Sequence, residues 1–195
     1  LVLDKPVCFG FAISNNQLMT DTVLYRKANL SDVRKLSVLY KTVYIQTYGR
    51  EGVSDEFANF ITKQFSEERL SSLVQNHPDN LVVAEYRNNL VGVAEIEFDK
   101  KSPVGNLVAP ELNKLYILDW FCGMGIGKQL LLQCEQIVRQ HGQKTLWLWV
   151  LISNDRAISF YEKNGFEWIG NASFQMEVNS YENKVMVKHL NDETA

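Results

Sequence analysis

The chain is poor in the residues that build metal centres and disulfide frameworks. Its 195 residues include only three cysteines, Cys8, Cys122 and Cys134, and three histidines. They form no Cys-x-x-Cys pair and no His-x-x-x-His pair, so we predict neither a metal site nor a disulfide framework. Cysteines that are not arranged for pairing are typical of a reducing compartment, which favours a cytoplasmic location.

The chain also lacks a long hydrophobic run and a strong excess of either charge. An apolar run at residues 7–13 is too short to cross a bilayer, so no membrane association is expected. The net charge is -3 and the lysines and arginines are scattered, which argues against a nucleic-acid-binding surface. A mildly acidic protein suits a cationic small molecule better.

The length and composition fit one compact domain. With 46% hydrophobic residues and no visible internal repeat, 195 residues can bury a full core. Met19 stands just before the first predicted strand and can serve as a natural start. We therefore expect residues 1–18 to be an extension, either non-native or packed as an added strand, and residues 19–195 to form a single domain.

Hydrophobic periodicity predicts a mixed arrangement of strands and helices. Helices are expected at residues 29–48, 54–65, 67–75, 125–141 and 155–164, and a long loop at 100–110. Strands are expected at residues 23–27, 81–86, 90–98, 112–118, 145–152, 167–176 and 183–190. This order predicts an α/β or α+β domain with a mixed sheet flanked by helices.

A glycine-dense turn joins the strand at 112–118 to the following helix. Gly123, Gly125 and Gly127 allow the backbone to approach an anion, and the helix start directs free N–H groups at it. The spacing excludes a Walker A loop, because Cys122 and Gln129 occupy its required positions. Lys128 likewise replaces the third glycine of a dinucleotide fingerprint. The turn therefore predicts a different pyrophosphate site.

A second motif follows this turn at residues 154–166, with the sequence Asn-Asp-Arg-Ala-Ile-Ser-Phe-Tyr-Glu-Lys-Asn-Gly-Phe. The two segments together resemble the GNAT superfamily of acetyl-CoA-dependent N-acetyltransferases, and the resemblance runs from residue 23 to 190. Residues 47–49, 116–117 and 172–176 are similar to bacterial polyamine and small-amine acetyltransferases. The resemblance implies a mostly antiparallel sheet of about seven strands, in which the parallel strands 112–118 and 145–152 splay apart around the cosubstrate.

The resemblance also implies which residues bind coenzyme A. A backbone N–H of Ile117 or Leu118 would hold the thioester carbonyl, and the glycine turn would hold the pyrophosphate. Cys122 departs from the family pattern, which has Gln or Arg at this position. The implied cosubstrate-binding residues are Tyr116, Ile117, Leu118, Cys122, Gly123, Met124, Gly125, Ile126, Gly127, Lys128, Asn154 and Tyr161.

Proton transfer requires an acid and a base. Tyr161 aligns with the family's proton donor, and a phenol of pKa about 10 can protonate a thiolate whose thiol has a pKa near 8.5; the alternative is that Tyr161 only packs on its helix. Glu95 and Glu97, on one strand face with Val91 and Val93, are candidate bases. Their alternative is an ordinary exposed strand face.

Aromatic residues are candidates for the acceptor pocket. Tyr40 and Tyr44 combine apolar surface with a polar tip, although their spacing equally fits core packing. Trp149 stands where related sequences often have glycine, so its ring is expected to narrow the gap between the splayed strands.

These observations predict an enzyme that transfers acetyl directly from acetyl-CoA to a primary amine of a small molecule such as a polyamine. Two alternatives remain open, namely a protein or peptide N-acetyltransferase and a non-catalytic CoA-binding protein. Departures at Cys122 and Trp149 motivate the second. Members of the family are often dimers, so the resemblance allows a homodimer.

Overall fold

The computed structural model describes residues 22–190, so the expected extension at 1–18 lies outside the described residues. Two short 3₁₀ turns, η1 (Leu30–Asp32) and η2 (Asp119–Phe121), accompany the helices and strands. The helices are α1 (Val33–Tyr48), α2 (Asp55–Gln64), α3 (Glu67–Asn76), α4 (Ile126–Gln140) and α5 (Asp155–Lys163). The strands are β1 (Leu24–Lys27), β2 (Leu81–Tyr86), β3 (Asn89–Lys101), β4 (Val108–Ile117), β5 (Thr145–Leu151), β6 (Glu167–Gln175) and β7 (Ser180–His189).

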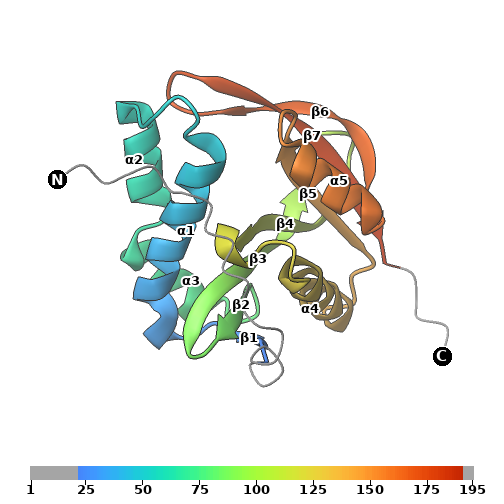
Figure 1. The fold of residues 1–195 in the computed structure, drawn as a ribbon. Helices are drawn as coiled ribbons and strands as arrows, with labels where there is room; N and C mark the ends of the chain where they lie inside the picture. The colour runs from blue at the N-terminus through green and yellow to red at the C-terminus, as the bar shows by residue number, and fades with distance from the viewer. Residues whose placement is uncertain (1–21, 191–195) are drawn as a thin grey trace.

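The strands form one mixed sheet in the order β1-β2-β3-β4-β5-β7-β6. Only the β4–β5 pair is parallel, and the other five pairs are antiparallel. Helices α1, α2 and α3 lie on one side of the sheet and α4 on the other, while β6 and β7 extend across the top of the molecule (Figure 1). The predicted fold class and strand number are confirmed.

The start of each surface helix follows from its local sequence. Ser54 and Ser66 cap α2 and α3, because each hydroxyl oxygen accepts a hydrogen bond from the backbone N–H three residues later. Acidic residues in the first turn of both helices complement the positive end of the helix dipole. These signals explain why the helix starts match the sequence prediction.

Strands β4 and β5 separate almost as soon as they meet. Their ladder has a single position, Glu111 opposite Trp147. The Trp147 indole Nε1 also donates a hydrogen bond to the Ala109 carbonyl at 3.0 Å, which fixes the two strands together at this end. Beyond it, Asn113 is an extra residue on β4, since Glu95 pairs with Lys114 and the next residue of β3 pairs with Leu112. The predicted splay is confirmed.

A second irregularity, between β2 and β3, changes which residues share a face. The register shifts beside Ala84 and Glu85, so β3 carries one extra residue there. Val91 consequently packs in the cluster under α4, whereas Val93 packs in the cluster under α1. The expectation that Val91 shares a face with Val93 and Glu95 is wrong, because a bulge reverses the alternation of side chains.

The predicted loop at 100–110 is also too long. Strand β3 continues to Lys101, which pairs with Val108 on β4, so the connection covers only residues 102–107. Asp99 has a φ of 56° within a register shift between Glu97 and Lys100. This kink interrupts the strand pattern locally, and the charged sequence gave no sign that the strand resumes after it.

Two apolar clusters hold the helices to the sheet. One cluster joins α4 and α5 to the sheet and includes Leu130, Val138 and Ile158. The other joins α1, α2 and α3 to the opposite face and includes Leu36 and Phe65. Each cluster lies on a single face of the sheet, so the gap between β4 and β5 does not divide either cluster in two.

A buried charge cluster centred on Glu95 ties the α1–α3 layer to the sheet. The Glu95 carboxylate accepts hydrogen bonds from the Tyr40 hydroxyl at 2.7 Å and from Arg69 Nη2 at 2.7 Å. Lys114 Nζ lies 3.8 Å from the same carboxylate, whose side chain is 0% exposed. Burial raises the pKa of Glu95, but Lys114, Arg69 and Tyr40 outweigh it and hold the pKa below its ordinary value. Glu95 is therefore a structural anion that joins α1, α3, β3 and β4.

We expect Glu95→Gln to lower the free energy of unfolding by about 3 kcal/mol, because it leaves the Arg69 and Lys114 cations without their buried anion. Since the pKa of Glu95 is lowered in the folded state, its contribution is present above the unfolded pKa and is lost as pH falls through the folded pKa. Urea denaturation of wild type and variant checks this. The exposed control Glu51→Gln should change stability by less than about 0.5 kcal/mol; equal losses in the two variants would contradict the role.

Candidate active site

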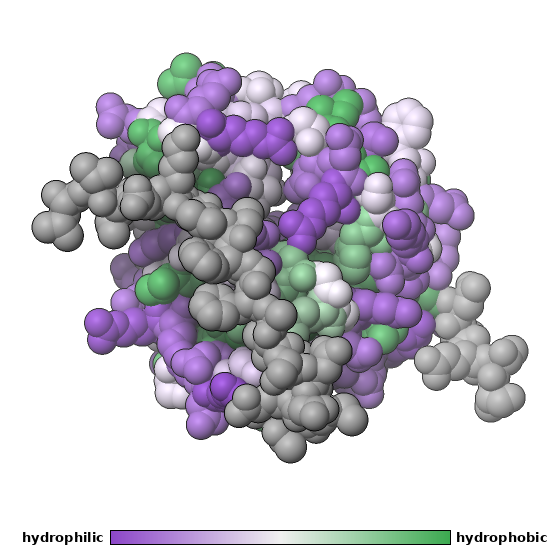
Figure 2. Space-filling model, in the orientation of Figure 1, coloured by the Kyte–Doolittle hydropathy of each residue, from purple (hydrophilic) through white to green (hydrophobic). Residues whose placement is uncertain are grey.

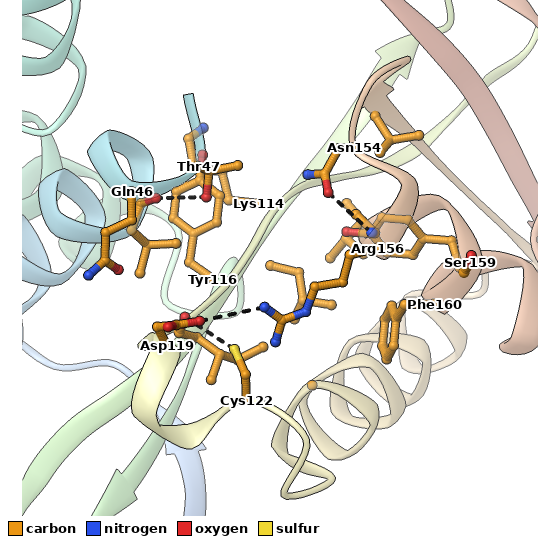
Figure 3. A pocket seen from close by; sticks show the side chains of 18 of the residues that line it. Gln46, Thr47, Lys114, Tyr116, Asp119, Cys122, Asn154, Arg156, Ser159 and Phe160 are labelled. Carbon is orange, nitrogen blue, oxygen red and sulfur yellow. Dashed lines mark hydrogen bonds and ion pairs between the residues drawn. The ribbon is translucent and has the colours of Figure 1, made fainter. Parts of the chain in front are cut away.

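A cavity of about 1020 Å³ opens where β4 and β5 separate. It is bordered by β4, the glycine turn, the start of α5 and the end of α1. Figure 2 shows hydrophilic side chains along part of the border of the hollow on this face, and Figure 3 shows the residues that line it. We call it the β4–α5 cleft. Its position matches the one expected for the cosubstrate.

The glycine turn presents open backbone to this cleft. Gly123 and Gly125 have φ values of 81° and 80°, a left-handed conformation that favours glycine, and Gly125 is the N-cap of α4. A Cβ built on either residue would meet no atom within 4 Å, so the space beside the turn is free for a ligand. At Gly127 a Cβ would lie 3.1 Å from Ile117 Cδ1, so this glycine permits close packing of α4 on β4 instead.

The structure brings together most of the residues expected to bind the cosubstrate. Those that line the cleft are Tyr116, Ile117, Cys122, Gly123, Gly125, Gly127, Lys128, Asn154 and Tyr161. Three others do not line it. Met124 is exposed to solvent, Ile126 is buried in the core under α4, and Leu118 packs against the cluster under α1. They differ because neighbouring residues of a turn or strand point in different directions.

The backbone amide of Ile117 is better placed than that of Leu118 to hold a carbonyl oxygen. The Leu118 N–H donates to the Val91 carbonyl at 2.9 Å, so it is already engaged. In an antiparallel pair the neighbouring residue directs its N–H away from the partner strand. Ile117, opposite Gly92, therefore directs its amide away from β3, toward the side on which β5 has separated.

Basic side chains supply positive charge around the cleft. Lys128, Lys163, Arg50 and Arg156 line it, against the single carboxylate of Asp119. Arg156 Nη1 lies 3.5 Å from Asp119 Oδ1, and this exposed ion pair joins α5 to the glycine turn across the hollow (Figure 3). This set fits the several phosphates of coenzyme A. Sequence reasoning missed Arg156, although it lies inside the second motif.

Cys122 stands at the position where the family has Gln or Arg. Its side chain is half-buried at the edge of the cleft, with Sγ 3.8 Å from the Leu118 carbonyl oxygen and 4.0 Å from that of Ile117. A thiol cannot supply the charge or the donors of an arginine. Arg156 reaches the same wall from α5 and provides a cation there (Figure 3).

Tyr161 lies on the buried face of α5 and lines the cleft. Its ring packs edge-on against Phe160 and Phe166, at centroid distances of 5.3 and 5.5 Å. Burial raises the pKa of the Tyr161 phenol well above its ordinary value, with smaller contributions from Tyr48 and Cys134. The phenol therefore keeps its proton at neutral pH, as a proton donor must.

Asn154 fulfils the capping role that its position predicted. Its Oδ1 accepts a hydrogen bond from the Ala157 backbone N–H at 3.2 Å and so caps α5. The same residue lines the cleft, as Figure 3 shows. Capping and ligand binding are thus compatible at this position.

A second cavity, of about 510 Å³, lies on the α1–α3 side of the splay. We call it the acceptor cavity. Five residues line both it and the β4–α5 cleft, so the two hollows meet between the strands: Tyr48, Asn113, Lys114, Tyr116 and Trp149. Trp149 borders the gap and Trp147 packs beside it at 6.3 Å between ring centroids. A ligand in each cavity would meet the other at this gap.

The predicted acceptor residues divide between cavity and core. Tyr44 and Trp149 line the acceptor cavity. Tyr40 does not line it, because its ring stacks on Phe65 at 5.2 Å and its hydroxyl is bound to Glu95. The helical spacing of Tyr40 and Tyr44 fitted both interpretations, and the structure assigns one residue to each.

The carboxylates near the gap have different environments. Glu95 does not line the acceptor cavity, and its partners Tyr40, Arg69 and Lys114 disfavour it as a base. Glu97 lines the cavity, but it accepts hydrogen bonds from Asn113 and, at 2.7 Å, from Lys100. It is therefore held by two neighbours.

Glu111 is a candidate base that sequence reasoning missed. It lines the acceptor cavity at the last position where β4 pairs with β5, and it is 8% exposed. Burial, followed by the nearby charge of Glu97, raises the pKa of Glu111 to about 7. The available signal was a carboxylate directly before the predicted strand at 112–118, but the sequence placed it beside a predicted loop.

The hairpin of β6 and β7 covers the acceptor cavity. Its turn is held by Glu56 at the start of α2, whose carboxylate accepts hydrogen bonds from the backbone N–H groups of Val178 and Asn179. Phe174 on β6 packs edge-on against Phe60 on α2 at 5.9 Å. Figure 1 shows the hairpin reaching from β5 across to α2. The helical layer and this hairpin therefore border the cavity on two sides.

Two further properties concern residues 22–190. No group of three or more His, Cys, Asp or Glu side chains in this range is arranged to hold a metal ion. No helix in it is both long and apolar enough to pass through a membrane.

Comparisons with known proteins agree with this geometry. The sequence pattern described as the acetyltransferase (GNAT) family matches residues 44–166. Spermidine N(1)-acetyltransferase of Thermoplasma acidophilum is 27% identical over 146 residues, which cover 73% of this chain and 86% of that protein. An uncharacterised N-acetyltransferase of Mycobacterium bovis is 26% identical over 136 residues, covering 70% of this chain and 83% of the relative.

A solved structure is similar over most of its length. The PaiA N-acetyltransferase of Thermoplasma acidophilum, in complex with coenzyme A, superposes with a TM-score of 0.69 at 25% identity. The match covers 86% of this chain and 99% of that chain. The expectation of an acetyl-CoA cosubstrate is thereby confirmed.

We expect Gly125→Ala to raise the Kd for coenzyme A at least tenfold, because a methyl group would enter the open space beside the turn and strain its left-handed backbone. Isothermal calorimetry measures this. The matched control is Gly142→Ala at the end of α4, where φ is 72° and a Cβ also meets no atom within 4 Å. The control should lose similar thermal stability but keep its CoA affinity; equal affinities for the two variants would refute the assignment of the turn.

Proposed function

Because the chain belongs to the acetyltransferase (GNAT) family and is an acetyl-CoA-dependent N-acetyltransferase, we propose that it acetylates the primary amine of a small molecule. The observation that carries this proposal is an acceptor cavity, partly covered by the β6–β7 hairpin, that meets the β4–α5 cleft between the splayed strands. The cleft is the proposed site of acetyl-CoA, which supplies the acetyl thioester. The amine would approach from the opposite side of the sheet.

The cover over the acceptor cavity favours a small molecule over a protein substrate. A protein N-terminus or lysine would need an open groove in which an extended peptide can lie. Here the Glu56 contacts and the Phe60–Phe174 packing bring the β6–β7 hairpin onto α2. The volume of about 510 Å³ falls within the range of small-molecule pockets.

The proposed chemistry uses a base, an amide donor and an acid. Glu111 lies six residues before Ile117 on β4, too far to touch an amine at a carbonyl held by the Ile117 N–H. It accepts the amine proton through water in the gap between the strands, as the nitrogen forms its bond to the acetyl carbonyl carbon. The Ile117 N–H stabilises the negative charge that develops on the carbonyl oxygen. The carbon–sulfur bond then breaks, and Tyr161 donates its proton to the departing sulfur. Solvent restores the proton to Tyr161 and removes the one held by Glu111.

A polyamine is the acceptor that the sequence resemblance favours, and the similarity to a spermidine N(1)-acetyltransferase supports a small amine of this kind. The test is the release of free thiol from acetyl-CoA with polyamines, amino acids, aminoglycosides and short peptides as acceptors. Turnover of a free small amine is expected. Activity confined to peptides would replace the proposal with the protein-acetylation alternative.

We expect Glu111→Gln to lower kcat/KM for the acceptor at least a hundredfold at pH 7.5, since it removes the proposed base. In the wild type, kcat/KM expressed on the concentration of neutral amine should rise with pH through about 7, because the pKa of Glu111 is raised to about 7 and the group must be ionised to act. The variant should lose this rise. Glu97→Gln is the matched comparison and should keep it; the reverse pattern would make Glu97 the base.

We expect Tyr161→Phe to lower kcat at least a hundredfold while the Kd for coenzyme A stays within twofold, because the ring packing is kept and only the proton donor is lost. Thiol release measures turnover and calorimetry measures binding. Tyr25→Phe, which removes a tyrosine hydroxyl outside both cavities, is the control and should keep wild-type turnover. Unchanged turnover in Tyr161→Phe would remove this residue from the mechanism.

A further inference from the structure

The charges around the acceptor cavity differ from those of a polyamine site. A site for several ammonium groups should carry an excess of carboxylates. Here cations outnumber carboxylates, even though the whole chain has a net charge of -3. The charged residues that line the cavity are Arg69, Lys100, Lys101, Lys114, Glu97 and Glu111.

Little carboxylate charge is left for a second ammonium group. Glu97 is engaged by Asn113 and by Lys100, whose Nζ lies 2.7 Å from it. Glu111 is the other carboxylate in the lining, and burial raises its pKa to about 7, so it is partly neutral at neutral pH. In the mechanism proposed above, it must also serve the amine that reacts. The lining can therefore accommodate one amine, not several.

Positive charge, in contrast, remains in surplus. Arg69 and Lys114 share the single carboxylate of Glu95, so this cluster carries one unbalanced cation. Arg69 Nη1 is buried and has no hydrogen-bond partner among the described residues. Lys101 forms no ion pair within residues 22–190, and its side chain is exposed at the cavity. After these pairs are counted, the lining keeps two positive charges when Glu111 is neutral and one when Glu111 is ionised.

The remaining wall of the cavity is apolar and aromatic. Helices α1 and α2 and the β6–β7 hairpin contribute its rings: Tyr44, Phe57, Phe60, Phe174 and Tyr181. Phe60 contacts both Tyr44 and Phe174, at centroid distances of 5.3 and 5.9 Å, so the rings form a continuous surface. Such a surface binds an apolar or aromatic body.

We propose that the acceptor is an amine that also carries a carboxylate and an apolar body, as a hydrophobic amino acid does. This inference rests on the acetyl transfer proposed above. The amine lies toward Glu111 and the gap between the strands, the carboxylate toward the surplus positive charge of Lys101 and Arg69, and the apolar body against the aromatic wall. A charged pair at a partly exposed site gives selectivity as well as affinity.

Binding can be tested without turnover by calorimetry on the complex of the enzyme with coenzyme A. The probes are 3-phenylpropionate, which has only the carboxylate, phenethylamine, which has only the amine, and spermidine. Isocaproate and isoamylamine repeat the comparison with an aliphatic body. We expect each carboxylate to bind at least tenfold more tightly than its matched amine and than spermidine. Tighter binding of the amines or of spermidine would overturn the proposal.

Variants of Lys101 give a second test. Charge reversal in Lys101→Glu should weaken 3-phenylpropionate binding about tenfold, because the new carboxylate repels the carboxylate of this probe. It should strengthen phenethylamine binding, because the same carboxylate attracts the ammonium group. Lys101→Gln should lie between wild type and the reversal variant. Lys63→Gln, on the exposed side of α2 outside both cavities, is the control and should change neither affinity. Equal responses of both probes to the reversal would contradict the assignment.

Turnover separates failure of this inference from failure of the proposed function. Phenylalanine and phenethylamine are compared by kcat/KM at equal concentrations of the neutral amine, which removes the effect of their different ammonium pKa values. A larger value for phenethylamine overturns the amino-acid inference while acetyl transfer to small amines stands. If the two carboxylate probes bind but no small amine causes release of thiol from acetyl-CoA, the proposed function fails. The charge preference of the cavity is upheld in that case.

Discussion

The separation of β4 from β5 is the constraint on which the site depends. A parallel pair normally continues its hydrogen bonds along both strands, but here the ladder has one position, Glu111 opposite Trp147. The extra residue Asn113 and the ring of Trp149 lie just beyond that point. The sheet tolerates the gap because the two apolar clusters hold α4 and α1 on either face independently. Interior backbone thereby becomes available to a ligand without loss of either core.

Burial and neighbouring charges give three similar carboxylates different properties. Glu95 is surrounded by Arg69, Lys114 and Tyr40, which lower its pKa and make it an anchor for the helical layer. Glu97 is exposed enough to be shared by Lys100 and Asn113. Glu111 forms no ion pair within residues 22–190, so burial, followed by the charge of Glu97, raises its pKa into the range of a base that works at neutral pH. The surroundings of each carboxylate, and not its residue type, decide whether it stabilises the fold or has the pKa of a base.

Cys122 stands at the edge of the cleft, where the sequence resemblance expects Gln or Arg. The glycine turn does not depend on that side chain for its open backbone, because Gly123 and Gly125 are left-handed and a Cβ on either would meet no atom within 4 Å. Arg156, on α5, lines the same cleft, where its guanidinium lies 3.5 Å from Asp119.

The sequence by itself determined the elements, their order, the glycine turn and the role of Asn154 as a cap, because periodicity, capping residues and glycine spacing act over a few residues. Only the tertiary structure decided which side chains reach the site. A bulge in β3 placed Val91 on the other face, and long-range ion pairs took Glu95 into the core together with Tyr40. Glu111 became a candidate base only where two distant strands diverge. Desolvation and charge pairing depend on contacts between distant segments, so local patterns cannot specify them.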